Sequence, residues 1–405
     1  MAQILFLSAW CPLPADNGSK LRIAHLLREL ARRHDVDLLA FAPESPGADA
    51  LRELRALCTT VELLPETPFA GRAGGRLRGL LSTTPRSVVA NHSPAMAAAV
   101  RARSGCGYDL VIASALHMAP YAMLLPETPR LLEEVELAVL REQYLAQTRL
   151  FSRIRYGLTW WKTCRYVASL LRHFAGATVV SERERMLLQP LAPAHLRLTV
   201  VPNGVDTTAC AESFGAPEAD TLIYPGALSY DANFDAVAHF LSAILPRIQA
   251  RRPDVRLRVT GRVTPAQIAA LPSANGVDFT GYLDDVRPAV ARAWAEVVPL
   301  RKGGGTRLKV LEALALGTPV VSTSKGIEGL ELEDGRHVLV ADSAADFAAA
   351  TERLLGQPAL RARLSADGRE AVRECYDWRT IGGRLNDLVL ETALDKGYGH
   401  AHGAN

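Results

Sequence analysis

Long apolar runs are missing from this sequence. Among its 405 residues, no uninterrupted apolar segment approaches the roughly 20 that a membrane-spanning helix needs. The apolar start, Met1 to Leu7, has no basic region before it and runs at once into Trp10, Cys11 and Pro12. It therefore predicts a first buried strand and not a signal peptide.

Cysteines are few and scattered. The six thiols form no CxxC pair and show no spacing typical of metal ligands. This pattern favours reduced thiols, and together with the missing signal peptide it predicts a cytoplasmic protein without a bound metal. The overall composition, 48% hydrophobic and 22% charged, is that of an ordinary globular chain and excludes general disorder.

Acidic residues are absent from two stretches of the first half, residues 67–108 and 143–181. Residues 1–204 carry 24 Lys and Arg against 17 Asp and Glu, a balance of +7, whereas the rest of the chain has a balance of −4. A basic half favours an anionic partner such as a phosphate, an acidic glycan or a lipid surface. A solvated basic surface is the alternative, and the sequence leaves both interpretations open.

The chain is too long for one compact core and suits two domains. Short apolar segments alternate with amphipathic ones, which predicts an α/β fold with parallel sheets in two Rossmann-like domains facing a cleft. We place the domains at residues 1–204 and 205–377, a helix returning to the first domain at 378–396, and a flexible tail at 397–405. Strands are predicted at 3–8, 36–41, 61–64, 109–113, 177–181, 198–201, 222–225, 255–260, 277–280, 296–300, 320–323 and 337–340. Helices are predicted at 20–33, 48–57, 135–174, 233–250, 286–294, 308–316 and 344–355.

The most informative segment is KGGGTRLKVLEALALG, residues 302–317, which follows a predicted strand and opens a helix. Its glycines and Thr306 form a loop whose backbone can approach a ligand closely and expose several N–H groups. The positive end of the helix dipole then favours a diphosphate. The glycines are Gly303, Gly304 and Gly305.

Charged side chains follow this loop. Arg307 and Lys309 place formal positive charge at the start of the helix, where an anion would bind. Glu312 lies about one turn further and offers two acceptor oxygens to adjacent hydroxyls, such as those of a ribose. A flexible loop before a solvated helix is the alternative interpretation, but it does not account for so many glycines and cations at one helix start.

Four motifs in this order resemble the second domain of the family 4 retaining glycosyltransferases, which have the GT-B fold. They are YPGALSYDANFD from Tyr224, GYLDDV from Gly281, the glycine loop with Glu312, and SKGIEGL from Ser324. In the first half, residues 12–30 and 114–121 are similar to a subgroup associated with exopolysaccharide and exosortase-linked sugar transfer. The resemblance implies an acceptor-side domain at 1–204 and a nucleotide-sugar donor domain at 205–377.

The resemblance also assigns residues of the donor domain. Glu312 matches the family glutamate that binds the donor ribose, whereas Gly304 stands where a second glutamate is expected near the donor sugar. Gly226 would lie at the diphosphate. Because no basic residue follows it between 227 and 233, we infer that Arg307 and Lys309 supply that charge. Tyr282 and Leu283 would hold the nucleobase through backbone contacts.

In the first half, the resemblance implies that Gly18 and Ser19 face the donor phosphate and that His117 lies near the reacting sugar. The alternatives are an ordinary Asn-Gly turn and a structural histidine. Arg22, on the helix after the turn, is expected to be a surface residue, with contact to the acceptor or the phosphate as the alternative.

Two further clusters carry open interpretations. Glu133, Glu134 and Glu136 are interpreted as a solvated or ion-paired helix start, with positioning of an acceptor hydroxyl as the alternative. The aromatic and basic segment around Trp160, Trp161 and neighbouring cations is interpreted as packing onto its own domain. The alternative is contact with a membrane, which would place the protein at the inner membrane face.

The predicted function is transfer of a sugar from a nucleoside diphosphate sugar to a glycan, lipid-linked or small-molecule acceptor, with retention of configuration and without a further cofactor or nucleic acid. The glycine-loop amides, Arg307 and Lys309 would stabilise the departing diphosphate. Because Gly304 replaces the family glutamate, a front-face route fits better than a double displacement. The alternatives are a non-catalytic nucleotide-sugar-binding partner of another transferase and a nucleotide-sugar epimerase.

Overall fold

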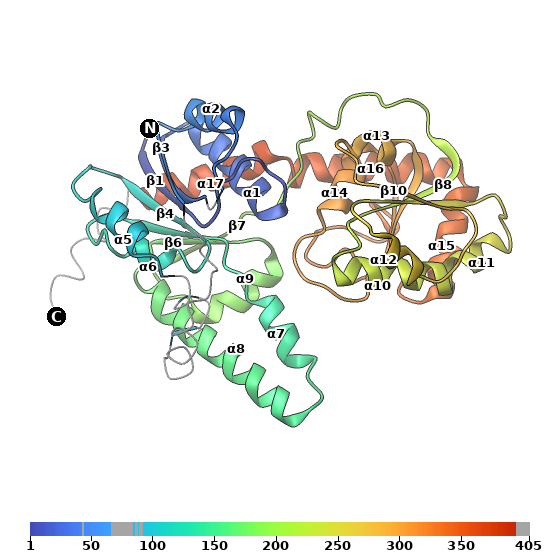
Figure 1. Cartoon of the computed structure of the whole chain (residues 1–405), viewed down its shortest axis with the longest axis horizontal. Helices are drawn as coiled ribbons and strands as arrows, with labels where there is room; N and C mark the ends of the chain where they lie inside the picture. Colours follow the sequence, from blue (N-terminus) through green and yellow to red (C-terminus); the bar gives the residue numbers. More distant parts are fainter. Residues whose placement is uncertain (43, 66–83, 86–87, 89–91, 394–405) are drawn as a thin grey trace. The chain divides into compact units, whose positions relative to one another are not determined.

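The computed structural model describes residues 1–42, 44–65, 84–85, 88 and 92–393 (Figure 1). The chain divides into two units, of which unit 1 contains Met1–Pro202 and the segment from Ile381 onward, and unit 2 contains Asn203–Thr380. The predicted tail at 397–405 and much of the first acid-free stretch, 67–108, lie outside the described residues.

Unit 1 is built on a parallel sheet with the strand order β3-β2-β1-β4-β5-β6-β7. Its central strands are almost wholly apolar and buried because helices cover both faces. The order reverses between β1 and β4, and such a switch point is where open parallel sheets bind ligands. The strands are β1 Gln3–Ser8, β2 Asp35–Phe41, β3 Thr60–Leu64, β4 Leu110–Ser114, β5 Arg130–Glu133, β6 Gly176–Val179 and β7 Arg197–Val200.

Several helices of unit 1 follow the predicted amphipathic segments, but those at 94–101 and 182–188 were not predicted, and one predicted helix is divided. The predicted helix at 135–174 is two helices, α7 Ala138–Leu145 and α8 Leu150–Leu171, which pack against each other. Gly157 permits this contact, since a Cβ there would lie 2.9 Å from the ring of Tyr144. The others are α1 Gly18–Ala31, α2 Ala48–Leu57, α5 Pro94–Arg101, α6 Ala119–Ala122 and α9 Glu182–Leu188.

The helix α17, Trp378–Ala393, packs onto unit 1 through its later residues. Asn386 Nδ2 donates to the backbone carbonyl of Glu29 at 3.2 Å. A Cβ at Gly382 would lie 2.4 Å from the Glu29 side chain, so only glycine allows this approach of α17 to α1. None of the helices within the described ranges is long and apolar enough to cross a membrane.

Unit 2 repeats the architecture with a parallel sheet of order β10-β9-β8-β11-β12-β13. Here the order reverses between β8 and β11. The strands are β8 Glu218–Pro225, β9 Arg256–Thr260, β10 Val277–Gly281, β11 Ala293–Val298, β12 Val320–Ser322 and β13 Leu339–Val340. The helices are α10 Asp231–His239, α11 Leu245–Gln249, α12 Pro265–Ala269, α13 Arg287–Ala291, α14 Leu308–Leu316, α15 Ala344–Gly356 and α16 Pro358–Cys375.

Two helical details of unit 2 differ from the prediction. The single helix expected at 233–250 contains a π-helical turn, Phe240–Ile244, between α10 and α11, and Pro246 follows that turn. Because proline lacks an N–H, it favours such an adjustment of the helical hydrogen bonds. The helices α12 and α16 were not predicted; α12 is a single short turn, and the surface of α16 is strongly polar with correspondingly weak apolar spacing.

A buried ion pair fixes α1 to the sheet of unit 1. Arg22 Nε lies 2.7 Å from Glu133 Oε1, and both side chains are 0% exposed. The same guanidinium donates to the carbonyls of Val201 at 2.9 Å and Pro202 at 3.0 Å, while Ser114 Oγ donates to the second oxygen of Glu133 at 2.8 Å. The prediction that Arg22 is a surface residue is therefore wrong, and Glu133 ends a strand and does not start a helix.

Removing one partner of this pair should destabilise unit 1 strongly. We expect Arg22→Leu to lower the free energy of unfolding by about 3–5 kcal/mol, because it leaves the Glu133 carboxylate buried without its counter-charge. Urea unfolding followed by circular dichroism measures the loss. The double variant Arg22→Leu/Glu133→Leu should regain much of it, and Arg52→Leu, at an exposed pair, serves as the control. An Arg22→Leu protein as stable as the control would contradict a structural role for the pair.

Candidate functional site

The carboxyl-terminal edge of the unit 2 sheet brings the predicted donor residues together. Gly226 follows β8 directly, and the loop from Arg301 to Thr306 leaves the neighbouring strand β11 to enter α14. Because both strands are parallel and flank the switch point, their exit loops share one edge of the sheet. The start of α14 therefore stands beside the residues that follow β8, as an anion site requires.

The glycine loop has a backbone conformation that its sequence requires. Gly303 and Gly305 have φ angles of +104° and +80°, in the left-handed region that favours glycine. Thr306 Oγ1 accepts a hydrogen bond from Asn203 Nδ2 at 3.0 Å, which fixes the end of the loop within unit 2. A Cβ at Gly303 would also lie 3.0 Å from Ala232, so the loop packs closely against the start of α10.

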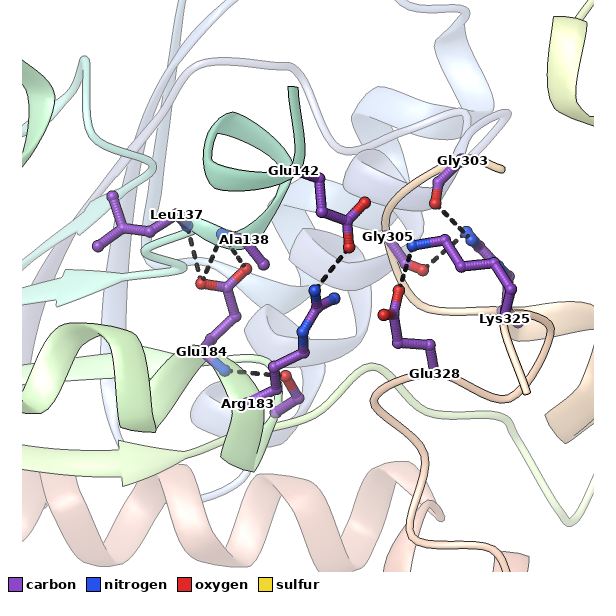
Figure 2. A network of polar contacts seen from close by, with 11 residues as sticks. Leu137, Ala138, Glu142, Arg183, Glu184, Gly303, Gly305, Lys325 and Glu328 are labelled. Atoms are coloured by element: carbon purple, nitrogen blue, oxygen red, sulfur yellow. Dashed lines mark hydrogen bonds and ion pairs between the residues drawn. The ribbon is translucent and has the colours of Figure 1, made fainter. Parts of the chain in front are cut away.

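Arg307 shapes this loop from within. Its guanidinium donates to the carbonyl oxygens of Gly303 at 2.8 Å and Gly305 at 2.9 Å, and also to that of Gly304. Figure 2 shows the carbonyls of Gly303 and Gly305 turned toward this contact. Arg307 is buried, and these hydrogen bonds direct its charge at the loop's own carbonyl groups. A direct contact between Arg307 and a donor diphosphate stays a prediction.

Lys309 is a cation close to the residues after β8. Its Nζ lies 3.2 Å from Asn233 Oδ1 and 3.9 Å from the centre of the Tyr224 ring. A Cβ at Gly226 would lie 2.8 Å from this Nζ, so the lysine side chain passes close to the backbone that follows β8. Burial lowers the pKa of Lys309 to about 8, an effect that Glu296 opposes. A further negative charge at this point, such as a phosphate, would favour the charged ammonium.

Glu312, on the same helix, is only partly exposed, and burial raises its pKa while Lys309 lowers it. It lies one turn beyond Lys309 along α14, close enough for the two side chains to interact electrostatically. Its role as a ribose ligand stays a prediction.

Glu296 is a functional candidate that the sequence analysis missed. It lies in the middle of β11, is fully buried, and neither carboxylate oxygen has a hydrogen-bond partner among the described residues. Burial raises its pKa well above the usual value, Lys309 lowers it and Glu312 raises it. The signal in the sequence was a single charge inside the apolar strand AWAEVV.

The loop predicted to hold the nucleobase follows β10. Gly281 ends this strand with a φ of +72°, and its carbonyl accepts from the backbone N–H of Gly261 at 2.8 Å. Tyr282 is largely exposed, and the Arg262 guanidinium lies 5.2 Å from the centre of its ring. Leu283 is partly exposed beside it. The loop thus presents backbone groups and an aromatic face at the same edge of the sheet as the glycine loop.

In unit 1, the predicted donor-facing turn is a helix cap. The Asn17 side chain accepts from the backbone N–H of Lys20 at 3.1 Å, so Gly18 and Ser19 form the exposed first turn of α1. Their N–H groups lie at the positive end of the helix dipole. Their contact with a donor phosphate stays a prediction.

His117 and Glu134 follow neighbouring strands of unit 1, β4 and β5. Burial lowers the pKa of His117 to about 4, so the imidazole is neutral near pH 7. Glu134 has a φ of +61°, which is rare for a residue other than glycine, and burial beside Glu133 raises its pKa to about 8. Both therefore lie at the carboxyl-terminal edge of the sheet, and their roles stay predictions.

The start of α7 is held by a separate set of polar contacts (Figure 2). The Glu184 carboxylate accepts from the backbone N–H groups of Leu137 at 2.8 Å and Ala138 at 2.9 Å, and Arg183 pairs with Glu142 at 2.6 Å. These contacts fix α7, and with it the neighbouring α8, to the body of unit 1. Among the residues that the structure describes, no group of three or more His, Cys, Asp or Glu side chains is arranged to hold a metal ion.

The amino-acid sequence matches two family descriptions, one in each half. Residues 17–209 match "Glycosyltransferase Family 4" and residues 219–357 match "Glycosyl transferases group 1", so the two matches together cover most of the chain. The chain belongs to glycosyltransferase family 4. The second match contains the glycine loop, Lys309 and Glu312 of this family 4 chain, and the first contains Gly18, Ser19 and His117.

Curated relatives of the family 4 chain include mannosyltransferases. It is 32% identical over 209 residues to a phosphatidyl-myo-inositol mannosyltransferase of Mycobacterium leprae, a match covering 49% of this chain and 54% of that protein. It is 30% identical over 227 residues to the MMP alpha-(1->4)-mannosyltransferase of Mycolicibacterium hassiacum, covering 54% of each. The chain thus spans about half the length of the curated relatives it matches.

Solved structures match over nearly the whole length of the family 4 chain. Sucrose-phosphate synthase of Thermosynechococcus elongatus matches with a TM-score of 0.65 at 19% identity, over 96% of this chain and 98% of that one. HepE of Anabaena, in complex with UDP and glucose, matches with a TM-score of 0.65 at 17% identity, over 96% and 100%. These likenesses confirm the predicted GT-B fold, while the narrower exopolysaccharide and exosortase-linked subgroup stays a prediction.

Replacing Glu296 should stabilise unit 2 at neutral pH. A carboxyl whose folded pKa is raised costs stability once the pH exceeds its unfolded pKa, near 4.5, because the folded state then holds the extra proton or an unsolvated charge. We expect Glu296→Gln to raise the free energy of unfolding by about 1 kcal/mol or more at pH 7–8, with the gain shrinking toward pH 4.5. Urea unfolding across this pH range measures it. A variant less stable than the wild type at pH 8 would contradict this prediction and indicate a net stabilising pair with Lys309.

Proposed function

We propose that this chain is a glycosyltransferase that transfers a sugar from a nucleoside diphosphate sugar to an acceptor hydroxyl, with retention of configuration. One observation carries the proposal: the glycine loop, the half-buried Lys309 and the Glu312 carboxylate meet at the switch point of unit 2, in a segment that matches the glycosyltransferase group 1 family. Such a point is where an α/β sheet binds nucleotides.

In this proposal Lys309 and the loop bind the diphosphate. Arg307 donates to the carbonyl oxygens of the loop glycines and holds these acceptors on its own side of the loop. The amide groups at the start of α14 can then donate to an anion. Lys309 then places a formal charge where the leaving diphosphate becomes more negative. Arg307 acts mainly by holding the loop, Glu312 binds the ribose hydroxyls, and Gly226, Tyr282 and Leu283 border the nucleotide.

The transfer step that we propose needs no carboxylate nucleophile on the protein. The bond between the anomeric carbon and the diphosphate oxygen breaks, and a bond from the acceptor oxygen forms on the same face of the sugar. The proton of the acceptor hydroxyl goes to the departing phosphate oxygen. Gly304, at the position where the family resemblance placed a glutamate, supports this front-face route because its residue type offers no attacking group.

The relatives suggest a sugar and an acceptor class. The names of several include mannose, and two name GDP-mannose as the donor. Others name phosphatidyl-myo-inositol, a lipid. We therefore propose mannose as the first donor sugar to test, and a lipid-linked molecule or a glycan as the acceptor. An acceptor of the exopolysaccharide-linked subgroup is the alternative.

The role of Lys309 is tested by nucleotide binding. We expect Lys309→Ala to weaken the binding of GDP or UDP by about tenfold or more, since it removes a charge-assisted contact in a partly buried site. Isothermal titration calorimetry at pH 7 measures the dissociation constant. The matched control is Lys302→Ala in the same loop, whose ammonium is exposed and pairs with Asp231 at 2.6 Å, and which should change binding by less than about twofold. Equal effects of the two substitutions would contradict the assignment.

Turnover is tested on a panel of nucleotide sugars that includes GDP-mannose and UDP-glucose, with lipid-linked and glycan acceptors, and the anomeric configuration of the product is read by NMR. Transfer with retention supports the proposal. Tight nucleotide binding without turnover across the panel would instead indicate a non-catalytic partner, and free epimerised sugar formed without acceptor would indicate an epimerase.

A further inference from the structure

The helix α8 carries an apolar stripe that no described residue covers. We call Phe151, Ile154, Leu158 and Trp161 the α8 stripe; they are 82%, 62%, 50% and 53% exposed. Their spacing of three and four residues places them on one helix face. Leu145 and Leu150, at the junction of α7 and α8, extend the exposed apolar surface.

The stripe is distinct from the faces through which α8 packs on the described part of unit 1. The inward face carries Thr163, Val167, Leu170 and Leu171, all buried. The adjacent α7 contacts α8 through Gly157, where the Tyr144 ring lies. The helix thus has its packing contacts within the unit, and the stripe lies outside them. Monomeric soluble proteins rarely expose several large apolar side chains together unless the patch binds something.

The charge around the stripe identifies what it binds. From Gln143 to Ser181 the chain has no acidic residue, and the exposed arginines of α8 stand among the apolar side chains. The Arg165 guanidinium lies 5.6 Å from the centre of the Trp161 ring, and that of Arg155 lies 4.8 Å from the centre of the Tyr156 ring. A helix with an apolar face bordered by cations and aromatic rings matches the interface of an anionic bilayer, where the rings and acyl region meet the headgroups.

A second copy of the chain suits this surface less well. A twofold contact through the stripe would bring the arginines of both copies to one interface without an acidic residue of the segment to oppose them. Figure 1 shows the joined ends of α7 and α8 projecting beyond the sheet of unit 1, so the junction can reach a flat surface. The contacts of Glu184 and Arg183 at the start of α7 hold this projection to the unit.

We propose that the α8 stripe and the α7–α8 junction form a docking surface for an anionic phospholipid bilayer. The helix α8 lies along the interface with the stripe among the acyl chains and its arginines among the lipid phosphates. The prediction that the aromatic and basic segment packs onto its own domain holds for Trp160 and Tyr166, which pack against the core of unit 1, whereas Trp161 is exposed. This docking concerns where unit 1 binds and does not depend on the donor chemistry of unit 2, although a membrane location suits a lipid-linked acceptor.

Vesicle binding of the full-length protein tests the proposal. The protein is floated with vesicles of phosphatidylcholine alone or mixed with phosphatidylglycerol. We expect binding to the anionic vesicles, weaker binding to the neutral ones, and a decrease as salt rises. Phe151→Ser/Leu158→Ser should lower the partition coefficient by about tenfold or more. Arg155→Glu/Arg165→Glu should lower it by about tenfold on anionic vesicles only.

The matched control is Ile268→Ser, an exposed apolar residue of α12 in unit 2, which should bind vesicles like the wild type. Circular dichroism and GDP binding should be unchanged in all variants, because the stripe contributes to neither. No vesicle binding by the wild type, or equal binding by the stripe variant, would overturn the proposal. So would a wild-type dimer that the stripe variant converts to a monomer, which would assign the surface to a second copy. None of these results bears on nucleotide binding, so the proposed function fails or stands separately.

Discussion

Every strand pair in the two sheets is parallel across the described residues, and this constraint places the chemistry of the molecule. Parallel strands deliver all their exit loops to one edge, and a reversal of strand order separates two of these loops enough for a ligand to enter. In unit 2 the glycine loop and Gly226 occupy that position. In unit 1 the corresponding edge carries His117 and Glu134. Function can therefore concentrate in loops while the buried strands remain apolar.

The two units treat buried charge differently. Arg22 and Glu133 in unit 1 satisfy each other and draw in two backbone carbonyls and a hydroxyl, so the pair holds the sheet, α1 and residues 201–202 together. Glu296 in unit 2 has no hydrogen-bond partner among the described residues, although it lies near Lys309. A satisfied network is what a structural role requires. A buried carboxylate without hydrogen-bond partners persists where selection favours something other than stability, such as control of the charge on a neighbouring side chain.

The sequence predicted the alternation of strands and helices well, because apolar strands and amphipathic helices leave periodic patterns that need no knowledge of distant residues. The glycine loop was found for a related reason, since consecutive glycines between a strand and a helix are typical of anion-binding loops. Arg22 was misjudged because its partner lies 111 positions away along the chain, and local spacing carries no such information. Glu133 was misjudged because the short strand β5 offers too few residues for its pattern to stand out beside α7. Exposure of the α8 stripe depends on tertiary packing, so the spacing of its residues is equally typical of a buried helix face.

The hydrogen bonds from Arg307 make the glycine loop asymmetric. The guanidinium binds carbonyl oxygens of three successive glycines, residues whose backbones are otherwise the most mobile in a chain. Because the three carbonyl oxygens are hydrogen-bonded to one side chain, the loop is ordered without a ligand. The conformational entropy that three free glycines would lose on binding is therefore lost on folding instead, so the proposed anionic ligand would meet a rigid template. A loop of this composition without the arginine would bind the same ligand more weakly, even though every ligand-contacting group were kept.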